Sequence, residues 1–156
     1  MKTRRGFFFL GLWLLMTLFA TAGQVHAALG EPLFSVERDQ EALSAVQSAG
    51  KVRDGYTVQE LVSDSTTIRE YVSASGIVFA VAWNGLVHPD LTLLLGSYAD
   101  EYQKTLQQTP REPGRRHLRV KTSEAVVEQW GHMRNLQGRA YVPALLPPGV
   151  STDEIK

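Results

Sequence analysis

The fold is decided by residues 56–83, which have the sequence YTVQELVSDSTTIREYVSASGIVFAVAW. This stretch contains three runs rich in β-branched and aromatic residues, the composition typical of strands. They are Tyr56 to Val62, Thr67 to Val72 and Ile77 to Trp83. Two serine-rich segments, residues 63–66 and 73–76, separate the runs and are typical of turns. The pattern predicts a three-stranded antiparallel meander.

Turn length sets the pairing within this meander. If the first turn has four residues, Val62 pairs with Thr67, and the strand period of two then places Glu60 opposite Arg69. These two side chains could form a cross-strand ion pair on the face that also carries Tyr71.

The second turn, if it also has four residues, pairs Val72 with Ile77 and Glu70 with Phe79. Glu70 would then lie among apolar side chains, with Gln59 as its polar neighbour. A carboxyl group in such a place is a candidate general acid. The alternative is a structural role, in which Glu70 bonds Gln59 or a backbone amide.

Two helices are expected outside the meander. Ser35 can cap a helix from Val36 to Ala49 that ends at Gly50. Asp90 can cap a longer amphipathic helix, in which apolar residues recur at helical spacing from Leu91 to Leu106 before Pro110. This longer helix should lie across the sheet.

The C-terminal third adds further strands. Three runs there favour strands: Leu118 to Thr122, Ala125 to Trp130 and Arg139 to Val142. A loop that contains Asn135 and Gly138 should separate the last two runs, and Ser151 with Glu154 forms a possible capping box. The predicted fold class is therefore α+β, with an antiparallel sheet packed by one long helix and a shorter N-terminal helix.

The first 27 residues have the pattern of a cleavable signal peptide. Three basic residues among the first five precede an apolar run from Phe7 to Ala20, which is too short to span a bilayer comfortably. Residues 25–27 offer small side chains at the usual cleavage positions. We expect cleavage after Ala27, export of residues 28–156 as one domain to the periplasm or beyond, and no membrane span in the mature chain.

Charge and cysteine content exclude several classes of protein. The chain of 156 residues carries 16 basic and 16 acidic residues, and loss of residues 1–27 removes basic residues only. A nucleic-acid-binding domain needs a basic surplus against the phosphates, so no nucleic-acid partner is expected. The absence of cysteine rules out disulfides, thiolate metal sites and cysteine nucleophiles.

Several short strings occur together in the mature part. They include Ala28-Leu29-Gly30, Arg69-Glu70-Tyr71-Val72, Gly131-His132-Met133, Gly138 to Pro143, and Leu146-Pro147-Pro148-Gly149-Val150. In this combination the chain resembles the small exported bacterial family catalogued as domain of unknown function 2844. The resemblance covers nearly the whole mature chain and implies an envelope-directed protein of one domain. It transfers no catalytic residue, because the family name carries no activity.

His132 is a second candidate for acid/base chemistry beside Glu70. It lies at a predicted strand end, where its imidazole could titrate, or it bonds a loop carbonyl in a structural role. No nucleophile elbow, phosphate-binding glycine loop or dinucleotide fingerprint accompanies either residue. No two histidines have the spacing of a metal site, so we expect neither a metal nor another cofactor.

Two pairs of residues are candidates for ligand binding. Arg69 with Tyr71 could bind an anionic group, unless Arg69 serves only to pair with Glu60. Arg115 and Arg116, in a basic loop, could contact anionic lipid headgroups, lipopolysaccharide or polymers, unless they are simply solvated.

These observations favour an exported, non-catalytic binding module of the cell envelope. Its partner would be an envelope protein, a peptide or an anionic polymer. The alternative is a small envelope hydrolase that uses Glu70 or His132 as acid or base.

Overall fold

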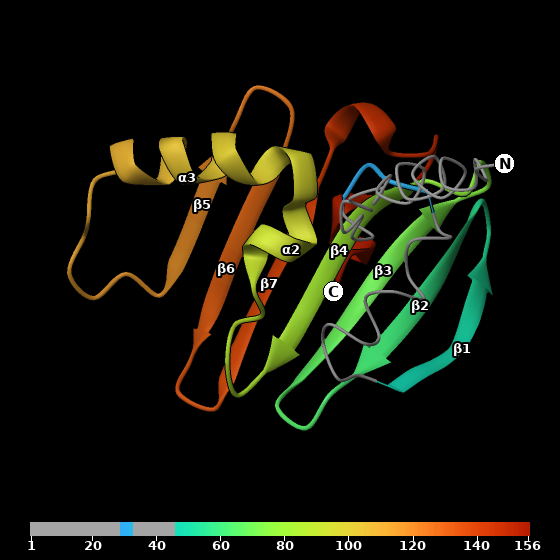
Figure 1. Cartoon of the computed structure of the whole chain (residues 1–156), viewed down its shortest axis with the longest axis horizontal. Coiled ribbons are helices and arrows are strands. Elements are labelled where there is room, and N and C mark those ends of the chain that lie inside the picture. The colour runs from blue at the N-terminus through green and yellow to red at the C-terminus, as the bar shows by residue number, and fades with distance from the viewer. Residues whose placement is uncertain (1–28, 33–45) are drawn as a thin grey trace, which may run out of the picture.

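The structure is a computed structural model that describes residues 29–32 and 46–156. In this part of the chain, seven strands form one antiparallel sheet in the order β1-β2-β3-β4-β7-β6-β5. The strands are β1 (Val46–Arg53), β2 (Tyr56–Val62), β3 (Thr66–Ser73), β4 (Val78–Gly85), β5 (His117–Lys121), β6 (Val126–His132) and β7 (Asn135–Tyr141). Two meanders, β1 to β4 and β5 to β7, join where β7 pairs with β4 (Figure 1). The predicted antiparallel sheet is confirmed.

The first predicted turn is confirmed in its register. Val62 pairs with Thr67 and Glu60 pairs with Arg69, as the four-residue turn requires. The Arg69 Nε and a Glu60 carboxylate oxygen lie 3.1 Å apart. The predicted cross-strand ion pair therefore exists.

The register predicted after the second turn is wrong. Val72 pairs with Val78 rather than with Ile77, because the Ser73 amide bonds the Ile77 carbonyl and lengthens the turn by one residue. A β-bulge then places Phe79 between two successive pairs, so Glu70 faces Val81 instead of Phe79. Phe79 consequently packs on the face opposite Glu70.

The predicted long helical segment is confirmed but is divided. It consists of α2 (Leu91–Leu95), the short 3₁₀ helix η2 (Gly96–Tyr98) and α3 (Ala99–Gln108). The Asp90 carboxylate accepts a hydrogen bond from the Thr92 amide at 2.8 Å, as expected of an N-cap. Gly96 has a φ of 50°, a left-handed conformation that interrupts the α-helix. Figure 1 shows α2 and α3 on one face of the sheet.

The predicted N-terminal helix of residues 36–49 is contradicted where it can be compared with the structure. Residues 33–45 lie outside the described residues, and residues 46–49 belong to β1. Gly50, the expected helix terminator, lies within this strand opposite β2.

The predicted loop around Asn135 and Gly138 is also wrong. Strands β6 and β7 continue to a two-residue turn, so both residues belong to β7. Gly138 lies against the indole of Trp83, and a Cβ atom there would be 2.2 Å from the ring. Close packing against a large side chain, rather than a turn, requires this glycine.

Each face of the sheet has its own apolar core. On the face covered by α2 and α3, the core includes Leu61, Val81, Trp83, Leu95 and Tyr102. The other face holds Tyr56, Tyr71, Phe79, Tyr141 and Ile155. Residues 143–156, with the 3₁₀ helices η3 (Pro143–Leu145) and η4 (Thr152–Glu154), cover this second face, which we call the groove face.

Candidate functional site

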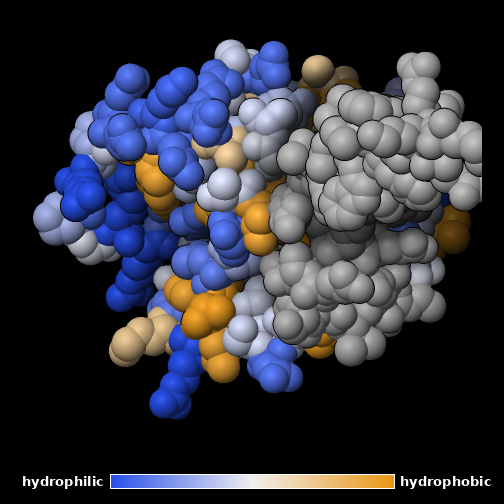
Figure 2. Space-filling view, viewed as in Figure 1, coloured by the Kyte–Doolittle hydropathy of each residue, from blue (hydrophilic) through white to orange (hydrophobic). Residues whose placement is uncertain are grey.

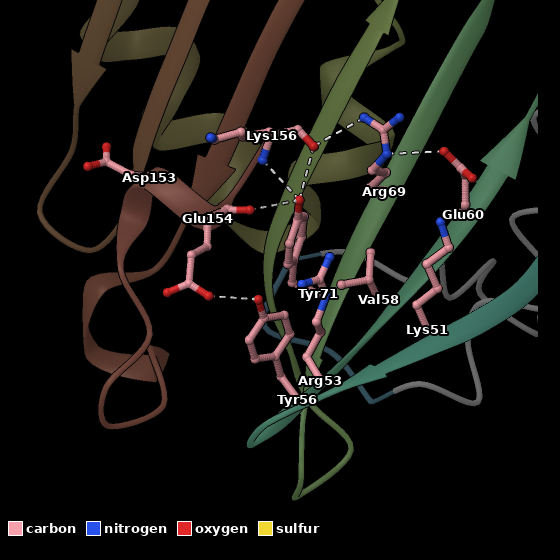
Figure 3. Close-up of a pocket in the computed structure, with 10 residues that line it drawn as sticks. All are labelled: Lys51, Arg53, Tyr56, Val58, Glu60, Arg69, Tyr71, Asp153, Glu154 and Lys156. Carbon is pink, nitrogen blue, oxygen red and sulfur yellow. Dashed lines mark hydrogen bonds and ion pairs between the residues drawn. The ribbon is translucent and has the colours of Figure 1, made fainter.

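Residues 151–156 divide the groove face into two hollows. One, of about 560 Å³, is the Tyr56 hollow, drawn in Figure 3. It is lined by Lys51, Arg53, Tyr56, Val58, Glu60, Arg69, Tyr71, Asp153, Glu154 and Lys156. The other, of about 640 Å³, is the Trp130 hollow. It is lined by His117, Glu128, Trp130, Gln137, Arg139, Asp153, Ile155 and Lys156.

A row of charged side chains crosses the groove face from strand to strand. Directly paired residues on antiparallel strands point to the same face, so the row follows from the register. Its members are Glu60, Arg69, Ala82, Arg139, Glu128 and Arg119. Ala82, the one apolar member, is fully buried in the same cluster as Ile155. The small side chain leaves space for the 151–156 segment between two arginines.

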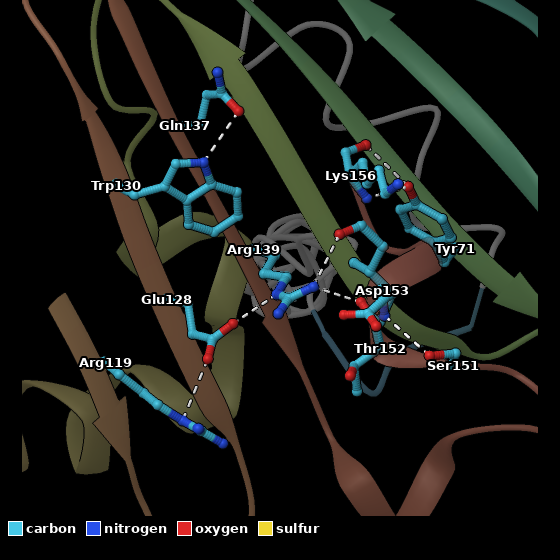
Figure 4. A network of polar contacts seen from close by, with 11 residues as sticks. Tyr71, Arg119, Glu128, Trp130, Gln137, Arg139, Ser151, Thr152, Asp153 and Lys156 are labelled. Atoms are coloured by element: carbon cyan, nitrogen blue, oxygen red, sulfur yellow. Dashed lines mark hydrogen bonds and ion pairs between the residues drawn. The ribbon is translucent and has the colours of Figure 1, made fainter. Parts of the chain in front are cut away.

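Both arginines beside Ala82 hold the backbone of the segment. Arg69 Nη1 donates to the Lys156 carbonyl at 3.1 Å, and Arg139 Nη1 donates to the carbonyls of Thr152 and Ile155. The Tyr71 hydroxyl donates to the Lys156 carbonyl at 3.0 Å and accepts from the Lys156 amide at 2.9 Å. These bonds, shown in Figures 3 and 4, fix the segment without a strand pair.

Glu128 holds the other half of the charged row in place. Its carboxylate is buried and accepts from Arg139 Nε at 2.6 Å, while Arg119 Nε lies 3.2 Å away (Figure 4). The guanidinium carbon of Arg139 also lies 5.7 Å from the centre of the Trp130 ring, within range of a cation–π contact. The positive charge of Arg139 is therefore engaged by Glu128 and Trp130.

Tyr56 and Glu154 both line the Tyr56 hollow and are bonded to each other. The Tyr56 hydroxyl donates to a Glu154 carboxylate oxygen at 3.0 Å. Burial raises the pKa of Tyr56, and the bond to Glu154 raises it further. The Ser151 amide lowers the pKa of Glu154, with a smaller contribution from the Tyr56 hydroxyl. The pair is thus a neutral phenol bound to a carboxylate at neutral pH.

Two exposed cations stand at the edge of this hollow. Strand β1 places Lys51 opposite Val58 and Arg53 opposite Tyr56, so both side chains point to the groove face. Among the described residues, neither cation has an acidic partner within ion-pair distance, in contrast to Arg69. Arg53 nevertheless interacts electrostatically with Glu154 and helps to lower the pKa of that carboxyl group, so its charge is partly balanced within the hollow.

The four predicted binding residues lie in two places. Arg69 and Tyr71 both line the Tyr56 hollow. Arg115 and Arg116 lie beside a separate cavity of about 200 Å³ together with His88. Arg115 is held by Glu112 at 3.1 Å, whereas Arg116 is exposed.

The two candidate acid/base residues lie outside both hollows on the groove face. Glu70 is fully buried and faces Val81, whose side chain belongs to the core under the helices. His132 is exposed at the end of β6, and its Nδ1 lies 3.2 Å from the Met133 carbonyl. In the described part of the chain, no hydroxyl or carboxylate bonds His132.

Several residues of the site could not be recognised from the sequence alone. They are Lys51, Arg53, Tyr56, Glu128 and Arg139. The contact between Tyr56 and Glu154 joins residues 98 positions apart, and short-range patterns carry no signal for such a contact. The cross-strand position of Glu128 and Arg139 could have been found only with the correct β6–β7 register.

Among residues 29–32 and 46–156, no three His, Asp or Glu side chains gather in a way that could hold a metal ion. None of the helices in the described part of the chain has the length and apolar character needed to cross a membrane.

In the part of the chain that the structure describes, the protein is a seven-stranded antiparallel sheet with helices on one face and a charged, tyrosine-lined groove on the other. The chain belongs to the family described as "Protein of unknown function (DUF2844)", whose model matches residues 25–155. Comparison with curated proteins and with solved structures finds no significant match.

Proposed function

We propose that the protein is an exported, non-catalytic binding module of the cell envelope that binds an anionic polymer in the Tyr56 hollow. The observation that carries this proposal is the pair of exposed cations, Lys51 and Arg53, beside a hollow lined by two tyrosines. Charged donors give charge-assisted hydrogen bonds to carboxylates or phosphates. Tyrosine rings supply apolar contact and a polar hydroxyl in the same side chain.

The rest of the hollow supports binding rather than turnover. Arg69, Glu60 and Glu154 are each held by a partner in the fold, so they shape the hollow. The hydrolase alternative gains no support from the geometry, since Glu70 is fully buried beside Val81, outside the hollow, and His132 lies at a hairpin end.

Export is supported by the N-terminal pattern. The charged start and the apolar run of residues 7–20 are typical of a signal peptide. The family model begins at residue 25, after this run and beside the expected cleavage position.

The proposal can be tested with alginate oligosaccharides, which carry a carboxylate on every sugar. Isothermal titration calorimetry would measure their binding to the protein. Uncharged dextran oligosaccharides of similar length are the control ligand. The protein should bind alginate and not dextran. Replacement of Lys51 and Arg53 together by alanine should weaken binding by more than about tenfold, since each lost contact is a bond to a charged group.

The matched control is Lys104→Ala, which removes an exposed cation from α3 on the other face of the sheet. This variant should bind alginate as the wild type does. Equal affinity of the double variant and the wild type would show that the Tyr56 hollow is not the binding site. Equal binding of dextran would refute recognition of charge.

A further inference from the structure

One end of the sheet carries exposed apolar side chains on two neighbouring loops. Leu86 and Val87, after β4, are 54% and 50% exposed, and Met133, in the β6–β7 turn, is 89% exposed. Gly85 pairs with Leu136, which in turn pairs with Gly131, so the two loops leave the sheet side by side. We call this region the β6–β7 end. Figure 2 shows hydrophobic surface there, where β4 runs toward α2 and β6 turns into β7.

The first loop holds its apolar side chains outward by its own hydrogen bonds. The Leu86 amide donates to the Ser65 carbonyl at 2.8 Å, and the Thr66 hydroxyl donates to the Val87 carbonyl at 2.9 Å. The Trp83 indole N–H donates to His88 Nδ1 at 3.1 Å. Two bonds to the loop backbone and one to the His88 side chain hold the loop in place, so Leu86 and Val87 stay exposed.

Basic side chains flank the apolar ones. Arg134 follows Met133 in the turn and has a φ of 69°, a left-handed conformation that costs a non-glycine residue about 1 kcal/mol or more. Arg116, also exposed, lines a small cavity with His88 and Leu136 of the same end. Asp64 is an exposed carboxylate on the β2–β3 turn. In the strand order this turn lies on the other side of β4 from Arg116, which precedes β5.

We propose that the β6–β7 end docks the protein onto an anionic lipid bilayer. Rigid loops with apolar tips and flanking cations match the two attractions that hold a protein at a membrane surface. Apolar side chains enter the boundary between headgroups and acyl chains, and arginines bind anionic headgroups. This surface is distinct from the Tyr56 hollow, which opens on the groove face and stays accessible when the end of the sheet is docked.

Co-sedimentation with vesicles tests the proposal. The protein should pellet with vesicles made of equal parts phosphatidylcholine and phosphatidylglycerol, and not with phosphatidylcholine alone. Binding should fall as salt is added. Replacement of Arg116 and Arg134 together by alanine should weaken binding by about 25-fold, since each basic residue near an anionic surface contributes about fivefold. Lys104→Ala, on the outer face of α3, is the matched control and should bind normally.

Met133→Ser tests the apolar contribution and should weaken binding by about tenfold. Its control is Val52→Ser, because Val52 is 82% exposed on β1 at the opposite end of the sheet. Equal loss in both serine variants would refute docking through the β6–β7 end, and so would failure of the wild type to bind anionic vesicles. A concentration-dependent dimer that Met133→Ser abolishes, without vesicle binding, would instead identify the end as a contact between two copies of the chain.

Discussion

Replacement of Ile155 by alanine should loosen the groove face and lower the stability of the whole fold. Ile155 is fully buried against an aromatic cluster that includes Tyr56, Tyr71 and Phe79. Truncation of a buried isoleucine to alanine costs about 2–5 kcal/mol, depending on how far the site can collapse. The 151–156 segment is held by side-chain hydrogen bonds and not by strand pairing, so it can shift partly into the space that the substitution leaves. We therefore expect the free energy of unfolding to fall by about 3 kcal/mol.

Urea unfolding followed by circular dichroism measures this loss. For a urea dependence of about 1.5 kcal/mol per molar, the midpoint should fall by about 2 M. The Lys156 amide, which donates to the Tyr71 hydroxyl, should also exchange its hydrogen faster in the variant. Val52→Ala is the control, because Val52 is 82% exposed and its truncation should change stability by less than about 0.5 kcal/mol. If Ile155→Ala shifts the midpoint no more than this control, residues 151–156 do not form part of the core.

Three other substitutions test separate contacts of the fold. Gly138→Ala should destabilise the protein by about 1–3 kcal/mol in thermal unfolding, because its Cβ would overlap the Trp83 ring; an unchanged melting temperature would refute this packing. Glu128→Gln should cost about 2 kcal/mol by urea titration, because it removes the charged partner of Arg139, whereas a more stable variant would contradict the assigned role of Glu128. Burial lowers the pKa of His88, so stability that is full above pH 6.5 should be lost as the pH falls through the folded-state pKa. The Trp83 indole N–H resonance should shift over the same interval and stay fixed if His88 does not accept its bond.

Local sequence patterns were sufficient to predict much of the sheet. The alternation and composition of residues 56–62 predict β2 with its observed bounds, and the four-residue turn after it places Glu60 opposite Arg69. Asp90 as an N-cap and the Ser151–Glu154 capping box are also confirmed. In each case the deciding interaction joins residues close in sequence, where turn and cap chemistry dominate.

The remaining errors have tertiary causes. The run from Ile77 to Trp83 is apolar on both faces, so nothing in it distinguishes a regular strand from one with a bulge at Phe79. Glycine is typical of turns, but Gly138 lies within a strand because its position leaves room only for a residue without a side chain. The indole of Trp83, on another strand, fills the space that a Cβ atom would need. Arg139 lies beside the 151–156 segment because β7 pairs with β4. These contacts depend on strand order, which single-sequence patterns do not contain.

The most direct test of the proposed function is an NMR titration of the isotope-labelled protein with alginate oligosaccharides. Binding in the Tyr56 hollow should give chemical-shift changes at Arg53, Tyr56 and Tyr71, which line it, and none along α3. Shift changes confined to other surfaces, or no change at all, would contradict the claim that this hollow binds an anionic polymer.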